Sequence, residues 1–249
     1  MGFFEQLRFL FTQPDPVQIK MRSESTGSGD VNLFYREFYD QVIGTGVVGK
    51  AQNRTHEKME RLWNKTNHIE RVLEVGAGDS CKHQQFVRHS YSEYVQTDVR
   101  TYPPTKNFMG IRNVQTVADA QMLPFVDNSF GRVIATCLLL HLQEPESALL
   151  EWRRVTENNG LITILIPTEP GLLLRLSRAL LTSPKARRLG FEGYSLFNAR
   201  DHRNHIPALR NLVEYVFQND QVTENRYPFR IPSWNLNLYF VYQIKIQKN

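Results

Sequence analysis

The sequence contains only two cysteines, Cys81 and Cys137, in 249 residues. Neither has metal-ligand spacing, and two thiols do not make a disulfide framework, so a reducing compartment is expected. No apolar run reaches the 18 residues that a membrane-spanning helix needs. The N-terminus lacks the features of a signal peptide, and Gln6 stands where a myristoylation signal needs Ser or Thr. We therefore expect a cytoplasmic protein.

The sequence also lacks a large excess of charge of either sign. The formal net charge is +5, with 22% charged and 41% apolar residues, which is ordinary for a folded domain. Glycine and proline are not concentrated enough to indicate a disordered or fibrous chain. The modest positive charge fits either a slightly basic surface or a preference for anionic partners.

Strand and helix patterns alternate through the middle of the chain. Residues 146–155 form an amphipathic helical pattern closed by Asn159-Gly160, and helical patterns also cover 81–90 and 207–217. From 31 to 63 a helical pattern is broken into two pieces by glycines. Such alternation predicts an open, mostly parallel α/β sheet with helices on both faces and an antiparallel C-terminal hairpin. The expected strands are 71–76, 93–98, 113–118, 132–137, 161–166, 222–229 and 236–247.

A glycine turn follows the first expected strand, in the segment Glu74-Val75-Gly76-Ala77-Gly78. Glycines let the backbone turn tightly and approach a ligand closely, and amides at a helix start can receive a negative group. Asp98 ends the next strand, where its carboxylate can accept hydrogen bonds from both hydroxyls of a ribose. These two features also suit a nicotinamide dinucleotide, although Cys81 stands where that fingerprint has Gly or Ala.

A third segment distinguishes a protein that binds a nicotinamide dinucleotide from another class of cofactor-binding protein. Residues 118–133 read ADAQMLPFVDNSFGRV. With the turn and Asp98, this resembles the class I S-adenosylmethionine-dependent methyltransferases, in the branch with a DA-x-x-LPF-x-D-x-SF segment. The resemblance covers about residues 70–170, although many relatives have Asp at the position of Gly131. It implies a seven-stranded Rossmann-like sheet and S-adenosyl-L-methionine as the cofactor.

The resemblance assigns residues to both ends of that cofactor. Glu74 would hold the amine or order the loop formed by Gly76, Ala77 and Gly78, and Asp98 would take the ribose. Each of these positions also has an ordinary structural explanation, such as a tight turn without a ligand.

At the adenine end, the resemblance implies that Asp119 accepts a hydrogen bond from the amino group. Ala120 would offer its backbone amide to a ring nitrogen, and Met122 would pack on the ring face with Leu123. Taken alone, Asp119 also suits a turn and Met122 suits the core. The order of all three signals along one framework favours a bound cofactor.

Methyl transfer from a sulfonium is an in-line displacement. The protein must align donor and acceptor, exclude water and remove a proton where needed. No metal is required, and we predict none. The Asn/Asp-Pro-Pro-aromatic loop of enzymes that methylate amines of nucleic-acid bases is absent, which argues against a nucleic-acid acceptor. His141 resembles a histidine frequent after the fourth strand in the family, and it suits either a base or a packing role.

The segment Ala199-Arg200-Asp201-His202-Arg203-Asn204-His205 lies where this family places acceptor-binding insertions. Its imidazoles and guanidiniums suit a phosphate or carboxylate, and they equally suit a surface loop with a local ion pair. His202 and His205 are three residues apart, so on a helical turn they would share one face. The catalytic candidates are therefore His202, His205 and His141.

Two apolar segments suggest contact with an amphiphile. Residues 172–188 are rich in leucine and cations, which fits either an anionic membrane surface or a lid helix packed on the core. Residues 1–12 have aromatic and leucine side chains near helical spacing. Peripheral membrane contact by these two segments would favour a lipid-linked acceptor.

We divide the chain into four parts. Residues 1–66 are an N-terminal helical or lid segment, 67–169 the Rossmann-like cofactor-binding core, 170–210 an acceptor-side lid insertion, and 211–249 a C-terminal helix and hairpin. The expected function is methyl transfer to a small or amphiphilic acceptor, such as a lipid- or glycan-linked one. The alternatives are an RNA or protein methyltransferase and a non-catalytic module that binds the cofactor.

Overall fold

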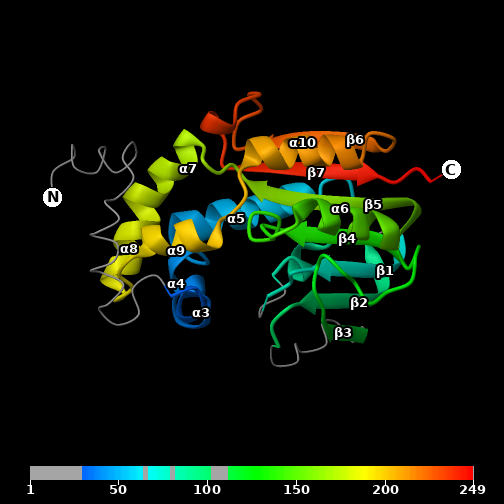
Figure 1. Ribbon diagram of the computed structural model, residues 1–249, viewed down its shortest axis with the longest axis horizontal. Coiled ribbons are helices and arrows are strands. Elements are labelled where there is room, and N and C mark those ends of the chain that lie inside the picture. Colours follow the sequence, from blue (N-terminus) through cyan, green and yellow to red (C-terminus); the bar gives the residue numbers. More distant parts are fainter. Residues whose placement is uncertain (1–29, 64–66, 79–81, 102–111, 249) are drawn as a thin grey trace.

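The computed structural model describes residues 30–63, 67–78, 82–101 and 112–248 (Figure 1). The helix expected over residues 1–12 lies outside the described residues. Within the described residues, no helix is long and apolar enough to cross a membrane.

Seven strands form a single sheet in the order β3-β2-β1-β4-β5-β7-β6. Neighbours from β3 to β5 pair in parallel, whereas β7 pairs antiparallel with both β5 and β6. The predicted sheet with its antiparallel C-terminal strand is therefore confirmed. The strands are β1 (His68–Val75), β2 (Ser90–Asp98), β3 (Arg112–Val117), β4 (Phe130–Thr136), β5 (Thr156–Pro167), β6 (Gln221–Tyr227) and β7 (Tyr239–Lys245).

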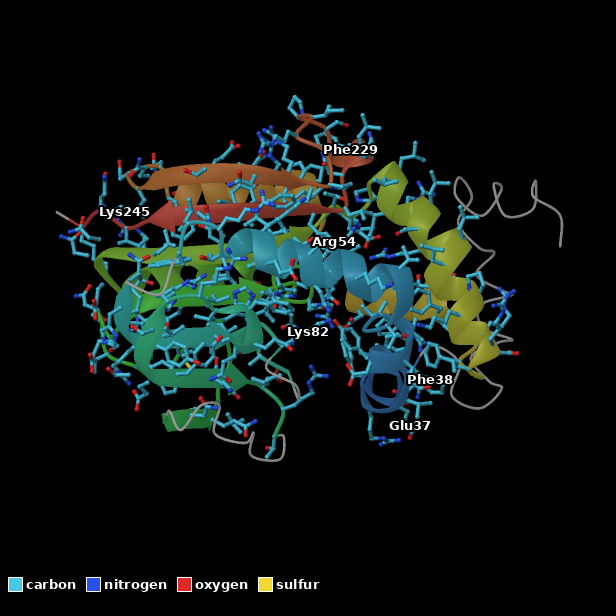
Figure 2. All side chains as sticks on the ribbon, turned by 180° about the vertical axis from the view of Figure 1, so that it is seen from behind. Glu37, Phe38, Arg54, Lys82, Phe229 and Lys245 are labelled. Carbon is cyan, nitrogen blue, oxygen red and sulfur yellow. The ribbon has the colours of Figure 1, made fainter. Side chains whose placement is uncertain are left out.

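Helices cover both faces of this sheet (Figures 1 and 2). On one face, α6 (Pro145–Val155) and α10 (Ile206–Val216) pack their apolar sides on β4, β5 and β7, with Trp152 fully buried in the main core. On the other face lies α5 (Gly46–Met59), whose buried Met59 packs on Leu165 and Val241. Successive side chains of β5 point to opposite faces of the sheet, and helices cover both faces. This explains why the strand is apolar along most of its length.

Short helices form a second layer beside the carboxyl ends of the parallel strands (Figure 1). Phe34 is buried at the centre of its aromatic core, packed on Phe191, Tyr194 and Phe197. This layer therefore joins the N-terminal helices to the insertion after β5. Its elements are α3 (Val31–Leu33), the π-helix η1 (Phe34–Phe38), α4 (Tyr39–Val42), α7 (Leu172–Ser177), the π-helix η3 (Arg178–Thr182), α8 (Ser183–Arg188) and α9 (Tyr194–Asp201).

Two local predictions are wrong. The described residues of the expected 81–90 helix form no α-helix; they contain the 3₁₀ turn η2 (Gln84–Phe86) and the first residue of β2, because His83 and Gln84 are buried against partners distant in the chain. The Asn159-Gly160 turn expected after α6 lies inside β5, where Asn159 has a φ of 64° and the pairing register with β4 shifts. A second 3₁₀ turn, η4 (Trp234–Leu236), precedes β7.

Candidate active site

The strand order reverses between β1 and β4, which in open α/β sheets is where ligands bind. The turn after β1 packs against the segment after β4. Gly76 has a φ of 66°, and a Cβ on it would lie 2.7 Å from Cδ1 of Leu138, so this position requires glycine. Gly78 also has a φ of 66°, but a Cβ there would meet nothing within 4 Å. The backbone at Gly78 therefore faces open space.

Asp98 fastens this turn to the end of β2. One carboxylate oxygen accepts a hydrogen bond from the Gly78 amide at 3.1 Å, and the other accepts one from the Arg100 amide at 2.9 Å. The Ala77 amide donates to the carbonyl of Thr97 at 3.0 Å. The carboxylate thus stands beside the glycine turn, at the position from which a ribose could be held.

A cavity of about 520 Å³ opens between the turn and the second layer, and we call it the cofactor cavity. Glu74 forms part of its floor and accepts a hydrogen bond from the buried Tyr94 hydroxyl at 2.7 Å. Lys82 contributes a cation whose ammonium donates to Gln52 at 2.9 Å, and burial lowers the pKa of this amine. Its lining includes five of the predicted cofactor residues, Glu74, Gly76, Ala77, Gly78 and Asp98.

The residues assigned to the adenine end, Asp119, Ala120, Met122 and Leu123, are not part of this lining. They lie in the loop after β3, next to the end of β2, where the Ala118 amide donates to the Asp98 carbonyl at 3.0 Å. Asp119 is exposed and accepts from the Gln121 amide, while the carbonyl of Ala120 accepts from Trp152 at 3.1 Å. Met122 is 76% exposed, which leaves an apolar side chain available on this loop.

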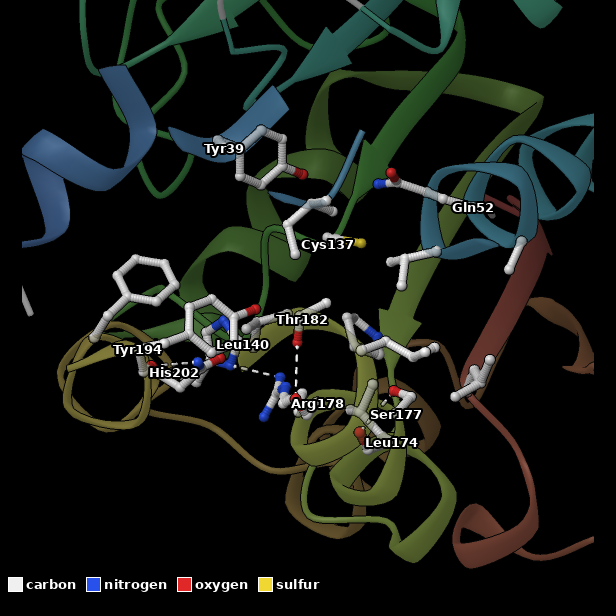
Figure 3. Close-up of a pocket in the computed structure, with 18 of the residues that line it drawn as sticks. Tyr39, Gln52, Cys137, Leu140, Leu174, Ser177, Arg178, Thr182, Tyr194 and His202 are labelled. Carbon is white, nitrogen blue, oxygen red and sulfur yellow. Dashed lines mark hydrogen bonds between the residues drawn. The ribbon is translucent and has the colours of Figure 1, made fainter. Parts of the chain in front are cut away.

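A second, smaller cavity of about 160 Å³ lies between α7, η3, α9 and the N-terminal helices, and we call it the apolar cavity (Figure 3). Its walls are largely aromatic and aliphatic. The two cavities share Tyr35, Tyr39, Gln52, Cys137 and His141 as lining residues. They therefore meet at the end of β4.

His141 is held at this junction by Asp201. Its Nδ1 lies 3.1 Å from Oδ2 of Asp201 and 3.2 Å from the carbonyl oxygen of the same residue. The Tyr35 hydroxyl donates to the same carboxylate oxygen at 2.7 Å. Burial alone would raise the pKa of Asp201, but His141 and Tyr35 hold it below its ordinary value. The carboxylate is therefore ionised and orients the imidazole.

His202 lines the apolar cavity beside a partly buried ion pair (Figure 3). Its Nδ1 lies 2.9 Å from Glu169 and 3.0 Å from the Arg178 guanidinium, which pairs with Glu169. Burial would raise the pKa of the Glu169 carboxyl, but His202 and Arg178 lower it to about 2. Burial lowers the pKa of His202 against the opposing effect of Glu169, so this imidazole is neutral at pH 7.

His205 does not join the other two histidines. Helix α9 ends at Asp201, and both His202 and His205 have extended backbone conformations. The prediction that these two histidines share one face of a helical turn is therefore wrong. His205 is exposed at the start of α10 and lines neither cavity.

Several lining residues have no counterpart in the sequence motifs. Tyr35 and Tyr39 are four residues apart in the N-terminal helices, so their spacing places them on one face. Glu169 and Arg178 come from the segment after β5, and nothing in their local sequence indicates that they pair. Only the tyrosine spacing offered a usable signal.

Comparison with known proteins agrees with this geometry. Residues 73–164 match the family model described as a methyltransferase domain. No curated protein shows significant sequence similarity to the chain. The matched residues run from β1 to β5 and include the glycine turn, Asp98 and the segment before β4.

Three solved structures share the fold. The PH0226 protein from Pyrococcus horikoshii has 15% identity and a TM-score of 0.59, covering 86% of this chain and 99% of its own. The 1,6-didemethyltoxoflavin-N1-methyltransferase of Burkholderia thailandensis has 16% identity and a TM-score of 0.57, over 95% and 92%. Phosphoethanolamine N-methyltransferase 2 of Haemonchus contortus has 12% identity and a TM-score of 0.53, over 90% and 61%.

The fold and the matched domain together define the class. The chain contains a methyltransferase domain, built on the open Rossmann-like sheet that the resemblance implied. More specifically, this domain is of the class I type, which depends on S-adenosylmethionine.

Proposed function

We propose that the protein transfers a methyl group to a small or amphiphilic acceptor bound in the apolar cavity. One observation carries this proposal: a cavity with charged lining residues at the β1–β4 crevice and an apolar cavity meet at His141, whose imidazole pairs with Asp201. When bound, S-adenosylmethionine supplies an electrophilic methyl group on its sulfonium. The residues described below bind the cofactor, orient the acceptor and take up its proton.

The cofactor cavity fits a ligand with a ribose and an amino-acid end. The Asp98 carboxylate can accept from two ribose hydroxyls beside the open backbone of Gly78. At the opposite end the cavity offers a carboxylate at Glu74 and a cation at Lys82, which suit an amine and a carboxylate. Asp119, Ala120 and Met122 are proposed to hold the adenine from the loop after β3.

At the junction, His141 is the proposed general base. Asp201 accepts from Nδ1 in this arrangement, which leaves Nε2 free to take a proton from an acceptor hydroxyl or amine. Tyr35 donates to Asp201 and keeps its own proton, since burial and the neighbouring carboxylate raise the pKa of the phenol. Tyr35 and Asp201 are therefore positioning residues for His141.

The apolar cavity supports an acceptor with a hydrophobic part and a polar group. Leucine and aromatic walls exclude water and bury apolar surface, whereas Arg178 and His202 present a polar edge. A cavity of this small volume suits an RNA or protein chain less well. The neighbour from Burkholderia thailandensis, which was solved with 1,6-didemethyltoxoflavin and S-adenosylhomocysteine bound, supports the same class. Location in the cytoplasm stays a prediction.

A metal-assisted reaction is the second candidate. Ligand atoms of His141, Asp201 and His202 lie within 4.8 Å of one another, a spacing that one divalent ion could bridge. We favour proton transfer by the protein, because the Arg178 cation lies 3.0 Å from Nδ1 of His202 and Tyr35 already donates to Asp201. Removal of divalent ions with EDTA should accordingly leave methyl transfer unchanged, and activity restored only by added metal would favour the alternative.

The function is tested by methyl transfer from labelled S-adenosylmethionine to a cell extract. The products are separated into lipid, glycan, small-molecule, RNA and protein fractions. We expect label in the lipid, glycan or small-molecule fraction. Label mainly in RNA or protein would contradict the proposed acceptor, and cofactor binding without transfer to any fraction would indicate the non-catalytic module.

A further inference from the structure

The net positive charge of the chain is concentrated in one segment. Residues 171–190 contain no acidic residue, and their cations match in number the excess of +5 that the whole chain carries, so the remainder is balanced. The cations of this segment are Arg175, Arg178, Lys185, Arg187 and Arg188. Arg178 lies inward beside the apolar cavity, while Arg187 and Arg188 are exposed at the end of α8.

Large apolar side chains are exposed among these cations. On the segment itself the exposed leucines are Leu172, Leu180, Leu181 and Leu189, each between 39% and 52% exposed. The loop before β7 adds Phe229, Ile231 and Leu236 together with the exposed Arg230. Asn235 of this loop accepts a hydrogen bond from the Leu172 amide at 3.2 Å, so the two segments adjoin (Figures 1 and 2). We call them together the leucine–arginine surface.

This surface is also the outer wall of the apolar cavity. Leu174, Ser177 and Thr182 of the same helical run face the cavity. Leu181 both lines the cavity and is 42% exposed, so its side chain stands between the cavity and the solvent. An apolar ligand leaving the cavity past Leu181 would emerge among exposed leucines and cations.

We propose that the leucine–arginine surface docks on an anionic membrane, from which an amphiphilic acceptor enters the apolar cavity. The second part of this proposal rests on the proposed function. Exposed leucines beside cations suit the boundary between acyl chains and negatively charged headgroups, where apolar burial and electrostatic attraction act together. A second copy of the chain suits the surface less well, because a symmetric contact would bring two strongly cationic segments together.

Membrane docking is measured by sedimentation of the full chain with lipid vesicles. The wild type should bind vesicles of phosphatidylcholine mixed with phosphatidylglycerol, bind pure phosphatidylcholine much less, and be partly released by high salt. The double variant R187E/R188E should bind the anionic vesicles about tenfold more weakly or worse. The matched control R88E/K245E changes two exposed cations at the opposite end of the sheet by the same charge and should bind like the wild type.

The contribution of the exposed leucines is tested by a second pair of variants, one on the leucine–arginine surface and one away from it. Leu180→Ser on the surface should weaken vesicle binding, whereas Leu150→Ser on α6 should not, although the two leucines are 52% and 51% exposed. Binding that falls equally in test and control variants, or a wild type that ignores both kinds of vesicle, would overturn the proposal. So would a concentration-dependent dimer that Leu180→Ser abolishes.

Binding of S-adenosylhomocysteine to the same samples separates this proposal from the proposed function. Surface variants that keep their affinity for this ligand are folded, and a loss of vesicle binding then reports on docking. A wild type that binds the ligand but no vesicle would remove the membrane proposal alone. One that binds vesicles but transfers no methyl group would remove the proposed function and leave the docking surface.

Discussion

His141 is the only one of the three predicted catalytic histidines that lines both cavities. His141→Ala should lower turnover by roughly 10²–10⁴-fold, the usual contribution of a positioned general base. Asp201→Asn should give a smaller loss, because it disturbs the orientation of the imidazole without removing it. The measurement is the rate of labelled methyl transfer to the acceptor fraction.

His205→Ala is the matched control for this prediction, since that imidazole is exposed and lines neither cavity. It should keep the wild-type rate. Wild-type turnover in His141→Ala, with a loss in His202→Ala, would move the base to the Glu169–Arg178 side of the apolar cavity.

A substitution of Asp98 tests whether this residue binds the ribose in the cofactor cavity. Asp98→Asn removes the charge of the acceptor for the ribose hydroxyls, and hydrogen bonds to charged groups contribute about 1.5–3 kcal/mol each. Affinity for S-adenosylhomocysteine should fall at least tenfold in calorimetric titration. Asparagine is preferable to alanine, because the Asp98 side chain also accepts from the Gly78 and Arg100 amides and so supports the loop. Unchanged affinity would place the ribose partner elsewhere.

Among the secondary-structure elements, the turn after β1 combines a left-handed glycine with a close side-chain contact. Gly76→Ala would force a side chain into the left-handed region and place its Cβ against Leu138. The backbone strain costs about 1–2 kcal/mol and the crowding about 1–3 kcal/mol. Denaturant unfolding should show a loss of both stability and cofactor affinity.

The variant Gly190→Ala tests the effect of backbone strain without crowding by a neighbouring side chain. Gly190 has a φ of 90° but nothing within 4 Å of an added Cβ, and it lines neither cavity. Its variant should lose less stability and keep cofactor affinity. Equal losses in the two variants would show that contact with Leu138 is unimportant.

The sheet could be predicted because its central strands β1, β4 and β5 contain short apolar runs bounded by turn residues. The expected helix at 81–90 failed for a tertiary reason. His83 is buried with Nε2 2.9 Å from Glu60 and Nδ1 2.7 Å from His56, so partners in and just after α5 determine its conformation. Periodicity within ten residues contains no information about such partners.

The cofactor cavity and its junction with the apolar cavity also differ in how far the sequence predicts them. The glycine turn and Asp98 follow consecutive strands, so their spacing along the chain reports their proximity in space. The junction with the apolar cavity brings Tyr35 and Asp201 together across 166 residues. From the sequence alone, Asp201 indicated only an ion pair within its own loop.

For the molecule as a whole, a buried polar network joins the region after α5 to the sheet. Arg132 on β4 is fully buried and donates to Glu60, which also contacts His83. Burial would raise the pKa of the Glu60 carboxyl, but Arg132 and His83 hold it well below its usual range. Burial and the same guanidinium lower the pKa of His89 to about 4.

This network predicts acid lability. The unfolded His89 takes up a proton near pH 6.5 and the folded one only near 4, so its contribution to stability falls as pH decreases through that window. Glu60 adds a further loss below its unfolded pKa, about 4.3, because its folded pKa is depressed. The free energy of unfolding should therefore decrease from pH 7 to pH 4, measured by denaturant titration.

His89→Gln should reduce the slope of stability against pH between 6.5 and 4. Glu60→Ala leaves Arg132 buried without its carboxylate and should cost about 3–5 kcal/mol at pH 7. Glu57→Ala on the exposed side of α5 is its control and should cost little. A stability that stays flat from pH 7 to pH 4 would contradict the assignment of neutral His89 and ionised Glu60.

The central claim is that the crevice between β1 and β4 binds S-adenosylmethionine. Calorimetric titration of the purified chain with S-adenosylmethionine, S-adenosylhomocysteine and nicotinamide dinucleotides tests it most directly. The account predicts binding of the first two with one site per chain and no measurable heat from the dinucleotides. Binding of a dinucleotide in preference to both sulfur ligands would contradict it.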